Sequence, residues 1–166
     1  MLQFARPLTA IFWLLLALLP SAAAYPAGMQ AMGNDSYAKI EHSNTGLPFL
    51  VALWSLDCPP CMKELEILDR VHQKYPHFKI VLINIDGIEA IDDAESRLAS
   101  FRLGSVSNWI FASEQAEKLR FSIDPQWYGE LPRSYLYQNG KRRGHSGLID
   151  ETRLWSWLDS LLPAGE

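Results

Sequence analysis

The segment WSLDCPPCMKE, residues 54–64, holds both cysteines of the chain, Cys58 and Cys61, with two prolines between them. An apolar run, FLVALW at 49–54, leads into this segment after a Gly-Leu-Pro turn signal. Such a run, bounded by Gly and Pro, is typical of a strand buried on both faces. After the cysteines, apolar residues recur at helical spacing as far as Pro76, and prolines are tolerated in a first helical turn. The segment therefore predicts a buried strand that runs into a helix, with the cysteines at the junction.

Strand and helix patterns alternate along the rest of the chain. Apolar runs at 79–86 and 108–112 predict two more buried strands, with an amphipathic helix within 89–102 between them. Because strands joined by helices run parallel, while a hairpin is antiparallel, we expect one α/β domain with a mixed central sheet and helices on both faces. The other expected elements are a short edge strand at 36–40, a helix that Ser113 caps and that reaches about Phe121, a hairpin at 133–147 turning at Asn139-Gly140, and a last helix capped by Asp150 and ended by Pro163.

The first 24 residues have the three-part form of a secretory signal. Arg6 gives a positive start, residues 10–19 are an apolar run too short for a comfortable bilayer span, and small residues follow Pro20. We therefore expect residues 1–24 to be a signal peptide, 25–36 a flexible lead and 37–163 the folded domain. Export would place the protein in the periplasm, an oxidising compartment, or on the membrane if the signal stays as an anchor.

The length, hydrophobic content and net charge of the chain limit which partners are expected. The chain has 166 residues, is 48% hydrophobic and carries a formal net charge of -4, which suits one globular domain, expected to be a monomer. Nucleic acid is not an expected partner, because binding it needs a basic patch. Lys141, Arg142 and Arg143 are adjacent, but beside Asn139-Gly140 they are interpreted as the charged edge of a hairpin.

The position of the two cysteines predicts redox chemistry. Cys58 falls at the carboxyl end of a central strand, where α/β sheets place their sites, and at a helix N-terminus, which favours the reactive thiolate. Cys61 follows one helical turn later, so a disulfide between the two would close too small a loop to stabilise the fold much. The alternatives are an inert structural disulfide, and a copper-binding or thiol-bearing chaperone. A zinc site is not expected, because the four histidines have no ligand spacing.

A family resemblance rests on these residues and on a later proline. Trp54, Cys58-Pro59-Pro60-Cys61, and Leu131-Pro132 before the hairpin resemble the thioredoxin superfamily over about residues 37–162. With Glu64, the leader and the additional helix at 89–102, the chain is similar to TlpA-like and ResA-like extracytoplasmic thiol–disulfide oxidoreductases, including those of cytochrome c biogenesis. The resemblance implies a thioredoxin fold with one inserted helix.

The resemblance also implies roles for single residues. Cys58 would be the attacking thiol, Cys61 the resolving thiol, Pro132 a cis-proline facing the pair, and Glu64 an acid/base group. The partners implied are a disulfide-bearing protein substrate and a membrane electron donor, without a bound cofactor. Trp54, Leu131 and Trp127 are the candidates for contact with the substrate.

Each of these assignments has a plainer alternative. Glu64 could lie on solvated helix surface, Trp54 could belong to the core, Trp127 could serve hairpin packing, and Pro132 could be an ordinary trans turn residue. Three positions depart from the family pattern: Asp57 stands where Trp is usual, Ala52 where thioredoxin has a buried aspartate, and Leu131 where Thr or Val is commoner.

Asp57 and Pro59 predict the direction of the reaction. A carboxylate beside a thiol raises the thiol pKa, and a proline lacks the amide that could otherwise donate to sulfur. We therefore expect Cys58 to be only modestly acidified. A less stabilised thiolate makes the reduced form less favoured, which favours a reductase or an isomerase over a strong oxidase.

Overall fold

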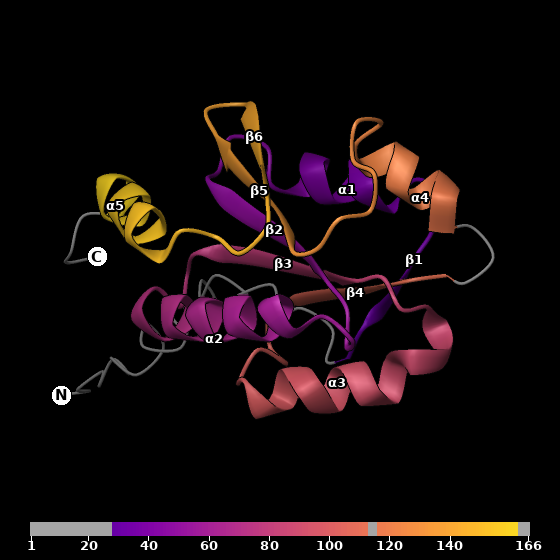
Figure 1. Ribbon diagram of the computed structural model, residues 1–166. Helices are drawn as coiled ribbons and strands as arrows, with labels where there is room; N and C mark the ends of the chain where they lie inside the picture. Colours follow the sequence, from indigo (N-terminus) through magenta and orange to yellow (C-terminus); the bar gives the residue numbers. More distant parts are fainter. Residues whose placement is uncertain (1–27, 113–115, 163–166) are drawn as a thin grey trace, which may run out of the picture.

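The computed structural model describes residues 28–112 and 116–162, which form one six-stranded sheet with helices on both faces (Figure 1). The strand order is β1-β4-β3-β2-β5-β6. The strands are β1 (Gln30–Met32), β2 (Phe49–Trp54), β3 (Lys79–Asn84), β4 (Ser107–Phe111), β5 (Arg133–Gln138) and β6 (Lys141–Ser146). The helices are α1 (Ser36–Ser43), α2 (Pro59–Lys74), the short 3-10 helix η1 (Ile88–Ala90), α3 (Ile91–Ser100), α4 (Ala116–Ile123) and α5 (Glu151–Leu161).

The sheet is mixed, as the alternation of strands and helices predicts. β2, β3 and β4 are parallel, and α2 and α3 make the crossovers between them. β5 pairs antiparallel with β2 and turns back into β6. Asn139 and Gly140 both have positive φ, 51° and 71°, which the tight turn of such a hairpin requires. The inserted helix expected within 89–102 is α3, which follows η1.

Two cores lie on opposite faces of β2. Leu50, Ala52 and Trp54 face the core under α2, α3 and α5, while Phe49, Val51 and Leu53 face the core under α1 and α4. Figure 1 shows α2 and α3 on one side of the sheet and α1 and α4 on the other. Because both faces of the strand are covered, its sequence is apolar without alternation.

Two expectations near the N-terminus are wrong. Residues 36–40 are not an edge strand but the start of α1, because Tyr37 and Ile40 are buried three residues apart, on one helical face. The edge position is taken instead by β1, which pairs parallel with β4 and lies inside the segment expected to be a flexible lead. That expectation is therefore corrected for residues 30–32.

Three other expectations concern residues outside the described ranges. The signal peptide at 1–24, the Ser113 cap and the stop at Pro163 all lie outside them. Within 28–112 and 116–162, no helix combines the length and apolarity needed to cross a membrane. The cap of the last helix is confirmed, because the Asp150 side chain accepts a hydrogen bond from the Arg153 amide at 3.0 Å.

Candidate active site

Cys58 and Cys61 lie where β2 runs into α2, and they are joined by a disulfide. Their sulfurs are 2.00 Å apart and their Cα atoms 5.2 Å apart. Cys58 is the N-cap of α2, and its Sγ accepts a hydrogen bond from the Cys61 amide at 3.2 Å. Pro59 and Pro60 fill the first two helical positions, where an N–H would have no helical partner. Of the first three helical residues, therefore, only Cys61 has an amide to donate to the sulfur.

The two sulfurs differ in their access to solvent. Cys58 keeps 9% of its surface exposed and Cys61 keeps none, so the pair is largely enclosed. A thiol or disulfide of another protein can reach a sulfur only from outside. Of the two cysteines, Cys58 is therefore the one with surface open to an approaching molecule.

A carboxylate from the next strand holds the loop that leads to Cys58. Asp86 follows β3, and its side chain accepts hydrogen bonds from Ser55 Oγ at 2.5 Å and from the Leu56 amide at 2.8 Å. Asn84 Nδ2 donates to the same carboxylate at 2.8 Å, and the Asp86 amide donates back to Asn84 Oδ1 at 2.9 Å. Sequence reasoning missed this clamp, because Asn84 and Asp86 were assigned to the strand itself. Two polar side chains at the end of an apolar run were the available signal.

Glu64 lies in the core and not on solvated surface. It is 2% exposed, accepts a hydrogen bond from Ser134 Oγ, and accepts another from the Ile149 amide at 3.1 Å. Burial raises the pKa of Glu64 above its ordinary value, and the hydrogen bonds from Ser134 and Ile149 offset part of that rise. Ser134 pairs with Ala52 across β5 and β2, so the Glu64 side chain reaches the sheet where Ala52 replaces the aspartate of thioredoxin. Neither Ser134 nor Ile149 was a candidate from the sequence.

The Leu131–Pro132 peptide bond is cis, and the alternative of a trans turn is excluded. Arg133 pairs with Leu53, so Pro132 lies just beyond the last pair, at the level of Trp54. The Pro132 carbonyl accepts a hydrogen bond from the Gly147 amide at 2.8 Å. Leu131 remains partly exposed while Pro132 is buried. The loop before β5 is thus next to the end of β2, where the segment that carries Cys58 begins.

The two candidate tryptophans are both buried. Trp54 is 1% exposed, and its indole N–H has no hydrogen-bond partner in the part of the chain that the structure describes. Trp127 is 5% exposed, and its indole donates to the Glu130 carbonyl at 2.9 Å. Both arrangements match the packing alternatives. The aromatic side chain available to a partner on that loop is Tyr128, which is 90% exposed.

The arrangement also bears on metal binding. Among residues 28–112 and 116–162, no group of three or more His, Cys, Asp or Glu side chains is placed to hold a metal ion. His145, on β6, contacts the Leu148 carbonyl through Nε2 at 3.1 Å.

Solved structures with a similar fold include thiol–disulfide oxidoreductases. A secreted disulfide oxidoreductase of Mycobacterium tuberculosis, described as homologous to Escherichia coli DsbE, aligns with 72% of this chain and 86% of its own, at 18% identity and a TM-score of 0.57. A thiol:disulfide interchange protein of Chlorobium tepidum, described as a thioredoxin family protein, aligns with 74% of this chain and 84% of its own, at 16% identity and a TM-score of 0.58. A DsbF homologue of Corynebacterium diphtheriae aligns with 73% of this chain and 76% of its own, at 18% identity and a TM-score of 0.57.

Neither the comparison with protein-family models nor that with curated proteins found a match to this sequence. The likeness is therefore one of structure, and it agrees with the fold expected from the cysteine motif and the cis-proline. The chain has a thioredoxin fold, with a disulfide-bonded cysteine pair at the N-terminus of α2.

Proposed function

We propose that this protein is an exported thiol–disulfide oxidoreductase that reduces or exchanges disulfides in partner proteins. The observation that carries the proposal is the Cys58–Cys61 disulfide at the start of a helix, with Cys58 partly accessible to solvent and Cys61 fully enclosed. A purely structural disulfide gains little from a three-residue separation, whereas an exchanging pair needs both closeness and unequal access.

In the reducing direction, the reaction needs no bound cofactor. The Cys58 thiolate attacks one sulfur of a partner disulfide, forms a mixed disulfide and releases the other partner sulfur as a thiolate. Cys61 then loses its proton and attacks Cys58 Sγ, which releases the second partner thiolate. The partner gains two electrons and two protons, and the Cys58–Cys61 bond stores the oxidation. A separate donor, which we take to be a membrane protein, must then reduce the pair.

Glu64 is the group that we assign to proton transfer. Its raised pKa makes its carboxylate a stronger base than that of an ordinary glutamate, and it lies on α2 one turn beyond Cys61. A buried carboxyl group of this kind can accept the proton that Cys61 must lose and give it up when the pair is reduced again. We propose this role in place of the strand aspartate that Ala52 replaces.

The surroundings of Cys58 support reduction over strong oxidation. The thiolate would receive one N–H at its sulfur, from Cys61, since Pro59 and Pro60 have none to give. Asp57 is exposed beside it and would oppose the negative charge. Both features destabilise the thiolate relative to a site with three free amides, so they favour the oxidised pair.

The substrate surface is proposed around the cis-proline. Pro132 lies at the level of Trp54, and Leu131 keeps an exposed edge there. The backbone of an incoming segment would lie against this loop while its sulfur meets Cys58. Because Trp54 and Trp127 are buried, we propose that they support this surface without contacting the substrate themselves.

The proposal that the protein is exported is based on the signal-like sequence of residues 1–24. We propose that residues 1–24 direct the chain to the periplasm and that the folded domain acts there as a monomer. A secreted protein is among the structural neighbours, which supports this placement.

Insulin reduction by dithiothreitol tests the function directly. An exchanging pair accelerates precipitation of the insulin B chain, and Cys58→Ser abolishes the acceleration. A copper-binding chaperone would leave the insulin rate unchanged and would bind Cu(I) stoichiometrically, an outcome that would replace the proposed function.

A further inference from the structure

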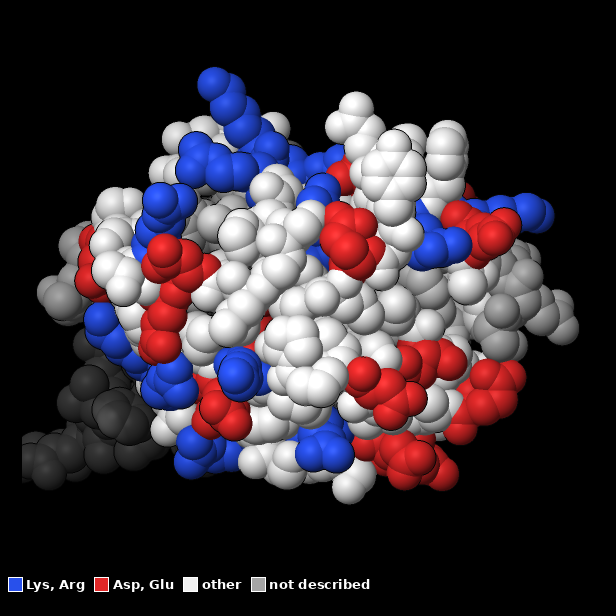
Figure 2. Space-filling view, in the orientation of Figure 1, with Lys and Arg blue, Asp and Glu red and all other residues white. Residues whose placement is uncertain are grey.

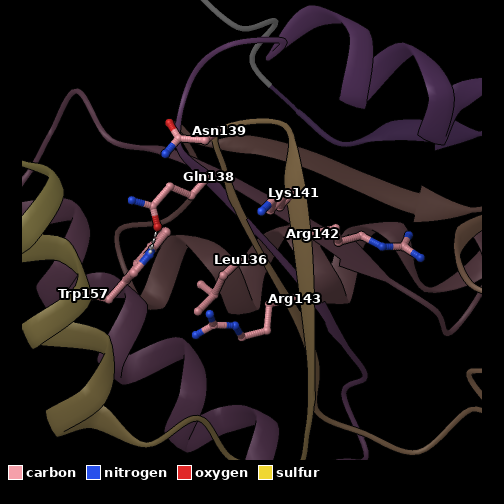
Figure 3. Close-up of a pocket in the computed structure, with 7 residues that line it drawn as sticks. All are labelled: Leu136, Gln138, Asn139, Lys141, Arg142, Arg143 and Trp157. Atoms are coloured by element: carbon pink, nitrogen blue, oxygen red, sulfur yellow. Dashed lines mark hydrogen bonds between the residues drawn. The ribbon is translucent and has the colours of Figure 1, made fainter.

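A groove separates the β5–β6 hairpin from α5, on the same face of the sheet as α2. It consists of two adjoining cavities of about 390 and 160 Å³, which share Leu136, Arg143 and Trp157 (Figure 3). We call it the hairpin groove. None of the residues proposed for thiol exchange lines it.

One wall of the hairpin groove is cationic. Lys141 and Arg143 occupy alternate positions of β6, and Figure 3 shows Arg143 extending toward Trp157 while Arg142 points the other way. Arg142 is held on the opposite face, where it donates to the Ile123 carbonyl at 2.6 Å. Lys141 and Arg143 make no ion pair or side-chain hydrogen bond with any described residue. Figure 2 shows the positive charge gathered at the hairpin.

The opposite wall is aromatic and fixed in place. Trp157 donates from its indole nitrogen to Gln138 Oε1 at 3.0 Å, and its ring meets the edge of Phe78 with centroids 5.8 Å apart. Leu136 and Leu154 add apolar surface beside it. A tryptophan that is already immobilised offers contact area at little further entropic cost. Arg153 and Asp150 both line the smaller cavity and pair with each other at 3.7 Å, so the cations of the groove that lack an acidic partner among the described residues are those of β6.

The cationic wall and the aromatic wall together indicate which side chains a bound segment would need. We propose that the hairpin groove binds an extended segment of a partner protein in which acidic and apolar residues alternate. Successive side chains of an extended segment point to opposite sides, so carboxylates can face Lys141 and Arg143 while apolar side chains face Trp157. Lys141 and Arg143 are two residues apart on one strand, about 7 Å, which is also the spacing of alternate residues in such a segment.

A second copy of this chain is a poorer occupant. β6 is the edge strand of the sheet formed by the described residues, so two copies could in principle pair there. That pairing would bring the Lys141, Arg142 and Arg143 side chains of both copies together, and like charges disfavour it. The chain is acidic overall, with a net charge of -4, so attraction of an acidic segment needs a local cluster of cations such as that of the hairpin groove.

Calorimetric titration of the full chain with three blocked hexapeptides tests the proposal. The peptides are three repeats of Glu-Leu, of Gln-Leu and of Lys-Leu. We expect the Glu-Leu peptide to bind at least about tenfold more tightly than the Gln-Leu peptide, and its affinity to fall as the salt concentration rises. The Lys-Leu peptide should not bind. Equal affinity for the Glu-Leu and Gln-Leu peptides would overturn the proposal.

Charge reversal in the groove supplies the matched comparison. The K141E/R143E variant should lose about tenfold or more in affinity for the Glu-Leu peptide. The control K39E/K118E makes the same change in net charge at exposed sites on α1 and α4 and should bind normally. Trp157→Phe should weaken binding by removing ring area. Normal binding of the Glu-Leu peptide by K141E/R143E would refute the assignment. So would sedimentation of the unmodified protein as a dimer and of K141E/R143E as a monomer.

The result is independent of thiol exchange. K141E/R143E should reduce insulin at the normal rate, since neither residue belongs to the cysteine site. Peptide binding without insulin reduction would leave the groove assignment intact and remove the proposed function.

Discussion

Cys58 Sγ accepts a single backbone N–H, from Cys61, because the two residues between them are prolines. Pro60→Ala would restore an amide at the second helical position, which can donate to a thiolate at the N-cap. We expect the reduction potential of the pair to rise, by up to about 30 mV, because the thiolate of the reduced form gains stabilisation. Equilibration with glutathione measures the shift. A fall in the potential would contradict this account of the motif.

Glu64 gives the fold a pH dependence with a defined sign. Burial raises its folded-state pKa above the ordinary 4.5, so the folded state holds the proton more tightly than the unfolded state. That contribution to stability is fully present below the unfolded pKa and is lost as pH rises through the folded pKa. Glu64→Gln keeps both hydrogen bonds, because its carbonyl can accept from the Ile149 amide while its amide donates to the Ser134 hydroxyl.

Urea unfolding across the pH range tests this. The stability of Glu64→Gln relative to the unmodified protein should increase from acid to neutral pH, and the variant should also lose the corresponding limb of the pH–rate profile for insulin reduction. A stability difference that does not change with pH would show that the carboxyl group does not titrate as its burial implies.

At the scale of elements, the clamp by Asp86 joins β3 to the loop before α2. Asp86→Ala removes the acceptor for Ser55 and for the Leu56 amide, and so frees the backbone that positions Cys58. We expect stability to fall by about 1 kcal/mol and the insulin rate by roughly tenfold, because the attacking sulfur is no longer held in place. Asp92→Ala, at an exposed position of α3, is the control and should change neither. Unchanged activity in Asp86→Ala would mean that the loop is positioned by other contacts.

The elements that sequence could predict are those with an unambiguous hydrophobic period. The run at 49–54 predicts β2 with the bounds that it has in the structure, since a strand covered on both faces must be apolar throughout. Residues 36–40 were assigned wrongly, because Tyr37 and Ile40 in a five-residue segment suit either a strand or one helical turn. Glu64 was identified, but not its partners, since Ser134 and Ile149 meet it only through tertiary packing.

At the scale of the whole molecule, Asp124 ties the end of α4 to the β5–β6 hairpin. Arg133 donates to it at 2.9 Å and the Tyr135 hydroxyl at 3.0 Å, with both charged side chains largely buried. Burial raises the pKa of Asp124, but hydrogen bonds from the Gln126 amide, Tyr135 and Arg133 outweigh it and leave the pKa below its ordinary value. Stability from this group is present above the unfolded value of 3.8 and is lost as pH falls through the folded pKa.

Asp124→Asn should therefore destabilise the fold by about 2 kcal/mol at neutral pH, since it leaves the largely buried Arg133 charge with the longer ion pair to Glu130, at 3.5 Å. The difference in free energy of unfolding between this variant and the unmodified protein should shrink as the pH falls toward the folded-state pKa of Asp124. Asp159→Asn breaks an exposed ion pair with Lys74 and should have no measurable effect. Denaturant unfolding of the three proteins at several pH values makes the comparison, and equal losses for the two variants would refute the role of burial.

The thiol-exchange reaction as a whole is tested most directly by trapping. In Cys61→Ser the mixed disulfide at Cys58 cannot be resolved from within, so covalent adducts should accumulate with proteins of the native compartment. Mass spectrometry of these adducts should locate every cross-link at Cys58, and the double variant Cys58→Ser with Cys61→Ser should trap none. Failure of Cys61→Ser to yield any adduct through Cys58 would contradict the account.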